Sequence, residues 1–324
     1  MAALREWAIK NFKVLNIKVE KYRWIDKWLP GYFDYAVEIY VRGKKFRGRG
    51  IDNKEETAFD KAIAESVERA VVWFSDLEYP WATSAYPDLE GAKERAYWEL
   101  LGIDRTICHH LCRVKAKKIS LDILDGKIDL DRFNFLLRKN RIYFELYEFR
   151  PTLDSKSVFA ISYSPNSRIG GFISGFGTDK DIKRACLHAI FECLRTAVVA
   201  FFDDIKPERS IEYLKERREP RWHFWKAQEK ASLDYLKKYI IPEEGEEIIL
   251  KTEDISIKDC DFITLNNSKE IFFDIPLYFA QAKSDKLITP QFGEIILDPK
   301  TQKRLEAFNE DICEIELNIP HFYG

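Results

Sequence analysis

The chain has 324 residues, of which 46% are hydrophobic and 14% aromatic, so it can bury a substantial core in one large domain or two ordinary ones. Its 52 basic and 54 acidic residues are interleaved and leave a net charge of −2, which argues against nucleic-acid and membrane partners. No run of 18 apolar residues is present, and the N-terminus lacks the apolar stretch of a signal peptide. Six cysteines in a chain of this size indicate reduced thiols and a cytoplasmic protein.

The first part of the chain predicts a strand-turn-strand-helix unit after an N-terminal helix. Alternating β-favouring residues, a Gly-containing turn and a long helical apolar pattern support it. The predicted elements are a helix over 4–17, a strand over 35–41, a turn over 42–45, a return strand from Phe46 and a helix over 54–74. We therefore expect a helical extension over 1–34, followed by a single domain over 35–324.

The same unit recurs later, so we expect repeat units over 35–74 and 157–203 and a C-terminal segment over 246–324. The second copy predicts a strand over 158–163, a turn over 165–167, a return strand over 171–176 and a helix over 180–202. The other predicted elements are helices over 90–113, 130–139, 208–218, 221–239 and 299–309, and strands over 117–123, 141–149, 247–251, 261–265, 270–282 and 312–318. The fold class is α/β of the α+β type, with antiparallel sheets packed against helices.

One helical phrase, Ala-x-x-Glu, occurs three times and ends at Glu65, Glu99 and Glu192. A Gly-x-Gly-x-Asp sequence lies 17 residues before the first and the last of these glutamates, beginning at Gly48 and Gly175. This shared register indicates a duplicated unit and puts one carboxylate at the same point of three apolar helices.

Glu65 and Glu68 project from one helix face, and Arg69 follows directly. If that apolar helix buries the pair, the two carboxylates need Mg²⁺ or an arginine to balance them. The alternative is a solvated face of an amphipathic helix. We expect Glu65, Glu68, Glu99 and Glu192 to converge on one cleft between the repeats.

Two further motifs have a structural and a functional interpretation. The Gly-x-Gly pairs could approach a phosphate, but they lack the Gly-Lys-Ser/Thr of a P-loop, so glycines at strand ends are favoured. Cys108-His109-His110-Leu111-Cys112 suggests zinc, yet no second ligand pair stands at finger spacing, so core cysteines are favoured.

Together these segments resemble the YcaO superfamily over about residues 35–324. The Gly48-x-Gly50 strand end and the helix with Glu65-Ser66-Val67-Glu68-Arg69 resemble its first signature. The later segments that resemble it are Ala92–Asp104, Gly175–Arg195, Ala280–Gly293 and the end of the chain at Pro320-His321.

The resemblance implies an ATP-dependent enzyme that phosphorylates a peptide-bond oxygen after a nucleophile has attacked the carbonyl carbon. A neighbouring Cys, Ser or Thr side chain then yields an azoline, and external sulfide yields a thioamide. Mg²⁺ would be held by glutamates of the signature helices, and basic or hydroxyl groups would contact ATP. The implied metal ligands are Glu65, Glu68, Glu99 and Glu192, and the implied cofactor-binding residues are Arg69, Lys61, Arg195 and Ser84.

The sequence also departs from the family pattern. Lys61 stands where the family has Ser, Gly102 and Ile103 replace Glu-Arg on the second helix, and Arg195 occupies the neighbourhood of a Gln. Ser84 lies in a segment only distantly similar to the family's Ser-Asn-Gly. One metal site is therefore expected to be weakened or missing.

Three interpretations follow from the sequence. The chain is an active YcaO-type enzyme acting on a peptide or protein substrate, a degenerate subunit that binds a partner or peptide without ATP chemistry, or an unrelated α/β binding protein. An active form would need a separate partner protein that presents the substrate or takes part in catalysis. A homodimer and a heterodimer of the chain are both compatible with the sequence. In the degenerate form, Lys61 and Arg195 are expected to pair with Glu65, Glu68 or Glu192. No catalytic residue is assigned.

Overall fold

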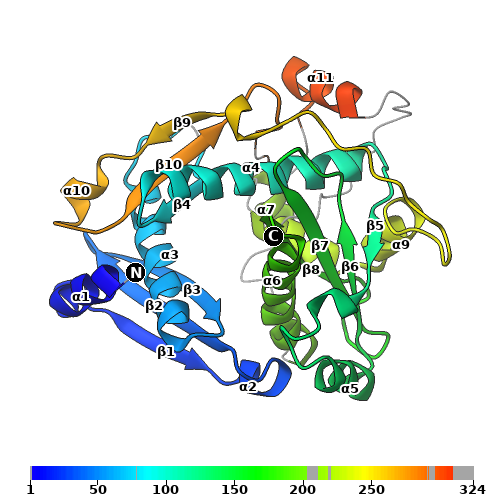
Figure 1. Ribbon diagram of the computed structural model, residues 1–324, viewed down its shortest axis with the longest axis horizontal. Coiled ribbons are helices and arrows are strands. Elements are labelled where there is room, and N and C mark those ends of the chain that lie inside the picture. Colours follow the sequence, from blue (N-terminus) through cyan, green and yellow to red (C-terminus); the bar gives the residue numbers. More distant parts are fainter. Residues whose placement is uncertain are drawn as a thin grey trace. The chain divides into compact units, whose positions relative to one another are not determined.

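The computed structural model describes residues 2–77, 79–202, 211–217, 220–289, 291 and 296–308 (Figure 1). The chain divides into two compact units. Unit 1 comprises Met1–Glu99 and Cys260–Lys283, and unit 2 comprises Leu100–Asp259 and Ser284–Gly324. Among the helices described, none combines the length and the apolar character that crossing a bilayer requires.

Unit 1 contains two small antiparallel sheets and the helices that cover them. Its elements are α1 (Ala2–Asn11), β1 (Lys18–Tyr22), α2 (Trp24–Trp28), β2 (Phe33–Val41), β3 (Lys44–Asp52), α3 (Glu55–Trp73), β4 (Thr83–Tyr86), β9 (Asp261–Thr264), α10 (Ser268–Ile271) and β10 (Tyr278–Lys283). The first sheet has the order β1-β2-β3 and the second the order β4-β10-β9. The segment 1–34, predicted to be helical, thus also supplies the outer strand β1.

The turn between β2 and β3 has only two residues, and both require a positive φ. Arg42 has φ 50° and Gly43 has φ 76°, the combination that matches the twist of a tight hairpin. Helix α3 then packs across this hairpin (Figure 1). Its apolar residues Ile63, Val67, Ala70 and Val71 are fully buried in the core of unit 1.

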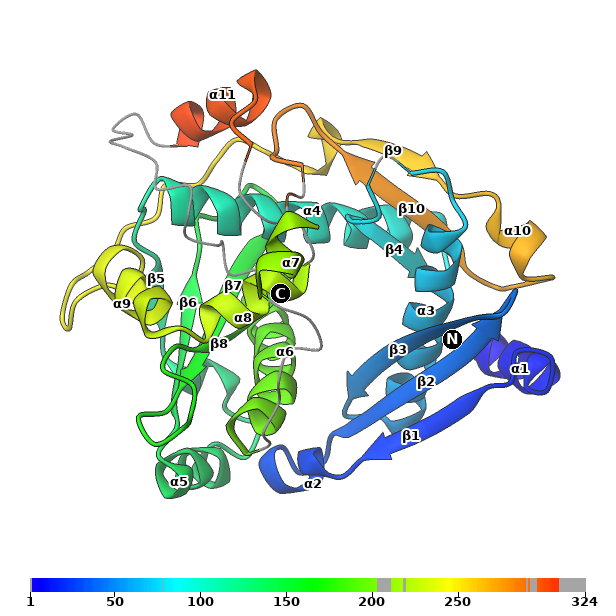
Figure 2. The same ribbon diagram turned by 180° about the vertical axis from the view of Figure 1, so that it is seen from behind.

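Unit 2 is built on a four-stranded antiparallel sheet of order β5-β6-β7-β8. Its elements are β5 (Lys117–Ile119), η1 (Leu121–Leu124), α5 (Leu130–Asn140), β6 (Tyr143–Glu148), β7 (Lys156–Tyr163), β8 (Ile173–Asp179), α6 (Ile182–Phe202), α7 (Ile211–Glu216), α8 (Pro220–Ala227), α9 (Lys230–Tyr239), η2 (Ile257–Asp259) and α11 (Pro299–Phe308). Helix α6 packs on β7 and β8, as Figure 2 shows from behind. Helix α4 (Leu89–Leu111) begins in unit 1 and ends in unit 2.

The predicted duplication is present, because β2-β3-α3 and β7-β8-α6 have the same internal packing. A Cβ added at Gly48 would lie 2.2 Å from the Ser66 nitrogen, and one at Gly175 would lie 2.3 Å from the Cys193 nitrogen. In both units the helix therefore rests directly on the strand backbone. These glycines serve close helix-strand packing, as the structural interpretation of the motif expects.

Some predicted elements are wrong. No strand forms over 247–251, and the strand predicted over 270–282 is the short helix α10 followed by β10. Asp274, with φ 50°, and Pro276 interrupt that segment. The helix predicted over 221–239 is two helices, α8 and α9. Where α8 ends, the carbonyls of Ala227 and Gln228 accept the N–H groups of Phe172 and Gly171, just before β8. The strand predicted over 312–318 lies outside the described residues.

Candidate functional site

The three Ala-x-x-Glu glutamates make the same hydrogen bond. Each carboxylate accepts a backbone N–H from the residue 16 positions earlier, in an edge strand: Glu65 from Arg49 at 2.8 Å, Glu99 from Thr83 at 3.1 Å and Glu192 from Phe176 at 3.0 Å. Because edge strands have unpaired backbone groups, this bond satisfies a donor that the sheet leaves open. The repeated phrase therefore has a structural cause, which fixes where each carboxylate lies.

In unit 1 three carboxylates lie close enough to influence one another. Glu68 accepts the backbone N–H of Ala85 at 2.7 Å. Burial, and then the negative charges of Glu99 and Glu65, raise the pKa of Glu68 well above its usual range. Glu65, Glu68 and Glu99 are referred to below as the glutamate cluster.

Two basic residues of α3, Arg69 and Lys61, balance little of the charge of this cluster. Arg69 donates to Glu65 at 2.6 Å, but the arginine side chain is 58% exposed, so the pair is weak. Lys61 pairs instead with Asp52 at 2.7 Å and with the carbonyl of Ile51. The degenerate interpretation expects Lys61 to pair with one of the predicted metal-ligand glutamates. Its partners are Asp52 and the carbonyl of Ile51 instead, so the structure does not support that expectation for Lys61.

Ser84 lies between the two residues of β4 whose N–H groups bind the cluster. Thr83 donates to Glu99, and Ala85 donates to Glu68. The side chain of Ser84 is 8% exposed, so most of it is removed from solvent. The predicted contact of Ser84 with ATP stays a prediction.

The glutamate cluster fits a hard divalent cation in its chemistry. Its donors are all carboxylate oxygens, and the pKa of Glu68 is raised first by burial and then by the negative charges of Glu99 and Glu65, which a cation would balance. Among the described residues, no three or more His, Cys, Asp or Glu side chains are grouped so that together they could hold a metal ion. Protein-bound Mg²⁺ that also binds phosphates commonly uses only one or two carboxylates, so a ligand set of this smaller size is what the cluster can offer.

Glu192 and Arg195 lie on α6 in unit 2. Glu192 is an exposed residue, and its carboxylate accepts the N–H of Phe176. Arg195 makes no ion pair with any residue in the described part of the chain. The convergence of Glu192 with the glutamate cluster involves both units and stays a prediction.

A second group of charges, in unit 2, is largely buried, and each of its four side chains has an ion-pair partner. Arg304 of α11 donates to Asp104 at 2.9 and 2.8 Å and to Glu253 at 2.9 and 3.0 Å. Arg105 donates to Asp104 at 2.8 Å and to Glu253 at 2.6 Å. We call these four residues the arginine-carboxylate network. It fastens α11 and the segment around Glu253 to α4.

The arginines of this network decide the ionisation of Asp104. Burial alone would raise the pKa of this carboxyl, but Arg304 and Arg105 outweigh burial and lower it. The N–H of Ile288 also donates to Asp104, at 2.9 Å. Asp104 is therefore a structural anion rather than a member of the glutamate cluster.

The two departures on α4 lie just before Asp104. Ile103 is 1% exposed and belongs to the core, whereas Gly102 faces Thr178, whose hydroxyl oxygen would lie 3.2 Å from an added Cβ. A glutamate at Gly102 would need Thr178 to shift. The local packing therefore matches the small residue that the sequence has there.

The Cys-His-His-Leu-Cys segment belongs to the core, as the structural interpretation expects. Burial raises the pKa of Cys112 to about 12, so its thiol stays protonated. His109 accepts the N–H of Arg150 at 2.8 Å, its other ring nitrogen contacts the carbonyl of Val114, and its ring stacks on Phe149. Both nitrogens are used, so the residue is not placed to bind zinc.

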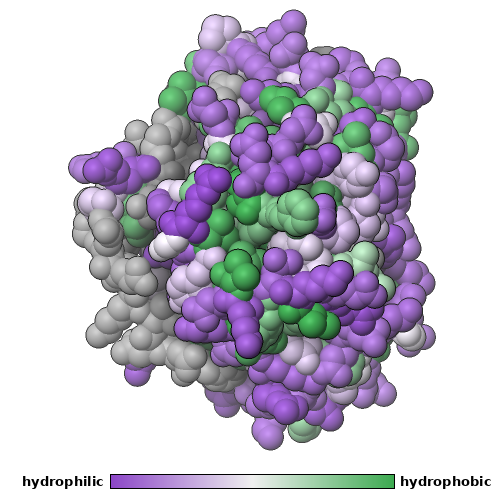
Figure 3. Space-filling model, turned by 90° about the vertical axis from the view of Figure 1, so that its left-hand side faces the viewer, coloured by the Kyte–Doolittle hydropathy of each residue, from purple (hydrophilic) through white to green (hydrophobic). Residues whose placement is uncertain are grey.

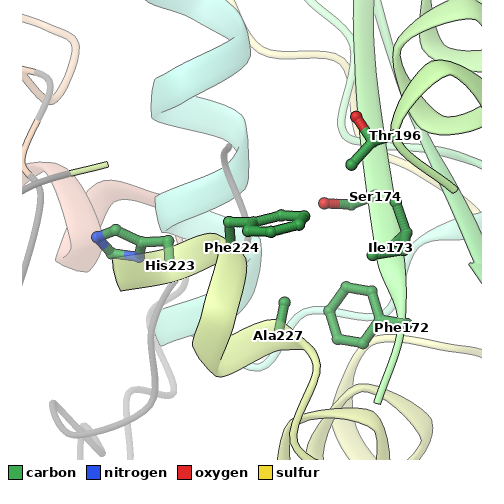
Figure 4. A pocket seen from close by; sticks show the side chains of 7 residues that line it. All are labelled: Phe172, Ile173, Ser174, Thr196, His223, Phe224 and Ala227. Atoms are coloured by element: carbon green, nitrogen blue, oxygen red, sulfur yellow. The ribbon is translucent and has the colours of Figure 1, made fainter. Parts of the chain in front are cut away.

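A small void in unit 2 can hold no more than about one water molecule, since its volume is about 10 Å³. Figure 4 shows that Phe224 points toward Ser174, while the ring of His223 points away from the void. The void is therefore not a ligand site.

Sequence reasoning missed the arginine-carboxylate network. Arg304 and Glu253 lie far from α4 in the sequence, and nothing in their local pattern marks them as buried. The one available signal was Asp104-Arg105, two charged residues inside the apolar part of α4. Buried charges need partners, which predicts that others must be supplied from elsewhere in the chain.

The repeated units, the edge-strand glycines and the glutamates that bind edge strands together define a YcaO-like fold. Solved structures support this assignment. A YcaO protein from Methanopyrus kandleri, bound with AMPPCP and Mg²⁺, matches with a TM-score of 0.57 and 13% identity over 92% of this chain and 95% of that one. The resemblance predicted from the motifs is confirmed at the level of the fold.

Two further solved structures match. A heterocyclase in complex with substrate and cofactor has a TM-score of 0.60 and 12% identity over 87% of this chain, which spans 52% of that protein. A chain of the E. coli microcin synthetase McbBCD complex has a TM-score of 0.54 and 13% identity, covering 83% of this chain and 88% of that one. No protein-family model matches the sequence. No curated protein matches it either.

Proposed function

We propose that this chain is a divergent YcaO-type enzyme that uses ATP and Mg²⁺ to activate backbone amides of a ribosomal peptide or a protein. The observation that carries the proposal is the glutamate cluster, in which burial, and then the charges of Glu99 and Glu65, raise the pKa of Glu68, and in which the exposed Arg69 pairs with Glu65. The similar fold of a protein bound with AMPPCP and Mg²⁺ supports the choice of ligand.

In this proposal the residues of unit 1 bind and orient the nucleotide. Glu65, Glu68 and Glu99 hold Mg²⁺, while Arg69 orients Glu65. Because β4 and β3 hold each carboxylate through a backbone N–H, the ligand oxygens are fixed before the metal arrives. ATP, when bound there, would supply the phosphoryl group that makes the amide oxygen a leaving group after a nucleophile has attacked the carbonyl carbon. The product is an azoline or a thioamide, according to the nucleophile.

Glu192, Lys61, Arg195 and Ser84 have further roles in the proposal. Glu192 completes the metal site from unit 2, Arg195 contacts phosphate, and Ser84 contacts the nucleotide. Lys61 would have to leave Asp52 to reach a phosphate. The free, mostly buried thiols among the described residues support the cytoplasmic location that the sequence predicts.

The test is calorimetry with Mg²⁺-ATP at millimolar concentration. We expect heat of binding for the native chain, weaker than for family members with an intact second signature, and none for Glu65→Ala. Glu90→Ala is the matched control, since this exposed acid at the start of α4 pairs only with Lys93. Absence of heat with the native chain would reject the enzyme.

A second candidate is a subunit that binds a partner or peptide without ATP chemistry. Exposed apolar side chains on unit 1 favour it, notably Ile9, Val14 and Phe273, which are 73%, 79% and 82% exposed. Trp7 of α1 donates to the carbonyl of Phe273 at 2.8 Å, so these segments adjoin. In the view of Figure 3, apolar side chains lie in the middle of the surface among polar ones. Such a face suits a partner protein or a second copy.

A further inference from the structure

An open pocket of about 590 Å³ lies in unit 2, and none of the residues of the proposed ATP site lines it. Pockets of this size commonly hold small ligands or peptide side chains. It is lined by Leu121, Asn134, Leu137, Arg138, Arg141, Ile142, Tyr143, Phe144, Pro165 and Asn166. These residues come from η1, from the end of α5, from the start of β6 and from the link between β7 and β8.

The charge of this pocket is entirely positive. Arg138 and Arg141 line it, no acidic residue does, and neither arginine forms an ion pair with a described residue. Arg141 ends α5 in the left-handed conformation, with φ 54°. Glycine would be more stable in that conformation by about 1 kcal/mol, so the arginine has a conformational cost. The lining therefore favours an anionic group.

The floor of the pocket is apolar, and one edge is open backbone. Leu137, Ile142 and Phe144 are buried side chains. Strand β5 pairs with β6 only at Leu146–Glu148. In the part of the chain described, no strand pairs with Tyr143–Glu145 on that side. This edge can accept another strand.

We propose that this pocket binds an extended acidic peptide segment. The peptide backbone adds to β6 at Tyr143–Glu145, an apolar side chain enters the pocket, and an acidic side chain pairs with Arg138 and Arg141. The carboxylate of Glu145 does not oppose this, because Lys118 pairs with it at 2.7 Å. The inference deepens the proposed function and rests on it, since it gives a peptide substrate a docking site. Peptide binding needs no nucleotide, so the two can be tested apart.

A structural role for the arginines has to be separated from binding. Basic residues at a helix C-terminus stabilise the helix dipole by themselves. Lys139 lies on the same turn of α5 but does not line the pocket; its ammonium lies 5.9 Å from the ring centre of Phe135. Lys139→Gln is therefore the matched control for Arg138→Gln. Arg141→Gly is a second variant, which is expected to raise stability while it removes the guanidinium.

The experiment measures fluorescence anisotropy of a labelled, capped peptide, with the whole chain and no nucleotide. The peptide has leucine and glutamate in turn at every second position and serine between them, so that both side chains lie on one face of an added strand. We expect Arg138→Gln and Arg141→Gly each to weaken binding about fivefold, as the loss of one partly exposed ion pair does. Lys139→Gln should bind as the native chain does. A peptide with glutamine for glutamate, and one N-methylated at alternate residues, should each bind about tenfold more weakly.

Three outcomes would overturn the proposal. They are equal binding by the native chain and both arginine variants, equal binding of the glutamate and glutamine peptides, and competition by free N-acetylglutamate as strong as by the peptide. The last would assign the pocket to a small organic acid. If the peptide binds but Mg²⁺-ATP does not, the docking site stands and the enzyme proposal falls; the reverse result rejects the docking site alone.

Discussion

Helix α4 contributes one carboxylate to each of two charged groups, and the two groups differ in how their charge is balanced. Glu99 joins the glutamate cluster, in which Arg69, an exposed arginine, pairs with Glu65. Asp104 joins the arginine-carboxylate network, where two buried arginines bond two carboxylates. The comparison teaches that a buried acid indicates a ligand only where the protein itself fails to neutralise it.

The largest expected effect is the loss of an arginine from the balanced group. Arg304→Met should lower the free energy of unfolding by about 3–5 kcal/mol, since Asp104 would stay buried with one partner fewer. Urea denaturation measures this. Lys303→Met, on the exposed side of the same helix, should change stability by less than about 0.5 kcal/mol. Equal, small effects of both variants would show that the network is not what holds α11.

The next prediction concerns the scaffold that places the carboxylates. Gly48→Ala and Gly175→Ala should each destabilise the protein by about 1–3 kcal/mol or more, since the added methyl would lie within 2.3 Å of helix backbone. Because the two sites are equivalent, the two losses should be similar. Thermal unfolding of the two variants provides the comparison. A large loss at one site and none at the other would contradict the duplicated packing.

The sequence predicted this scaffold well, since its signals are local. Glycine spacing, strand alternation and the apolar stripes of α3 and α6 all act within one repeat, and the structure has them in the predicted order. The Ala-x-x-Glu register also predicted equivalent carboxylates. It did not predict that each would bind an edge-strand N–H, because that bond depends on where strands end in the sheet.

The rest could not be predicted from the sequence, for a physical reason. Arg304 looks like any surface arginine of an amphipathic helix, and only the tertiary contact with Asp104 makes it buried. The family resemblance implies a cofactor contact for Lys61, at the position of a family Ser. In the structure Lys61 pairs with Asp52, which lies at the end of the adjacent strand, and only the folded backbone brings these two residues together. Long-range pairing of charges has no periodicity to detect.

Lowering the pH should change stability in opposite directions at the arginine-carboxylate network and at the glutamate cluster. Burial lowers the pKa of His109, which lies beside the arginine-carboxylate network, to about 3. Between pH 6.5 and 3 this histidine is therefore protonated in the unfolded chain and neutral in the folded chain. Stability contributed by this neutral histidine is therefore lost as the pH falls through that window, by about 2 kcal/mol at pH 5. His109→Gln can still accept the N–H of Arg150 and should flatten this slope. An unchanged slope in urea midpoints against pH would show that other groups cause it.

The smallest expected effect concerns the glutamate cluster, where stability should change with pH in the direction opposite to that at His109. The pKa of Glu68 is higher in the folded chain than in the unfolded chain. Above the unfolded pKa, the cost of ionising Glu68 therefore lowers the stability of the folded chain. As the pH falls through the folded pKa, protonation of Glu68 removes this loss of stability. Glu68→Gln keeps an oxygen for the N–H of Ala85 and removes the charge. At neutral pH it should therefore stabilise the protein by about 1 kcal/mol.

The same substitution should weaken Mg²⁺-ATP binding if the cluster is a metal site, because repulsion among unliganded carboxylates is what a bound cation reverses. Added Mg²⁺-ATP should accordingly raise the melting temperature of the native chain more than that of Glu68→Gln. Glu90→Gln supplies the baseline for removing an exposed carboxylate from α4. If Glu68→Gln destabilises the protein instead, the carboxylate is already neutralised within the fold. The glutamate cluster would then resemble the arginine-carboxylate network, and the distinction between them would disappear.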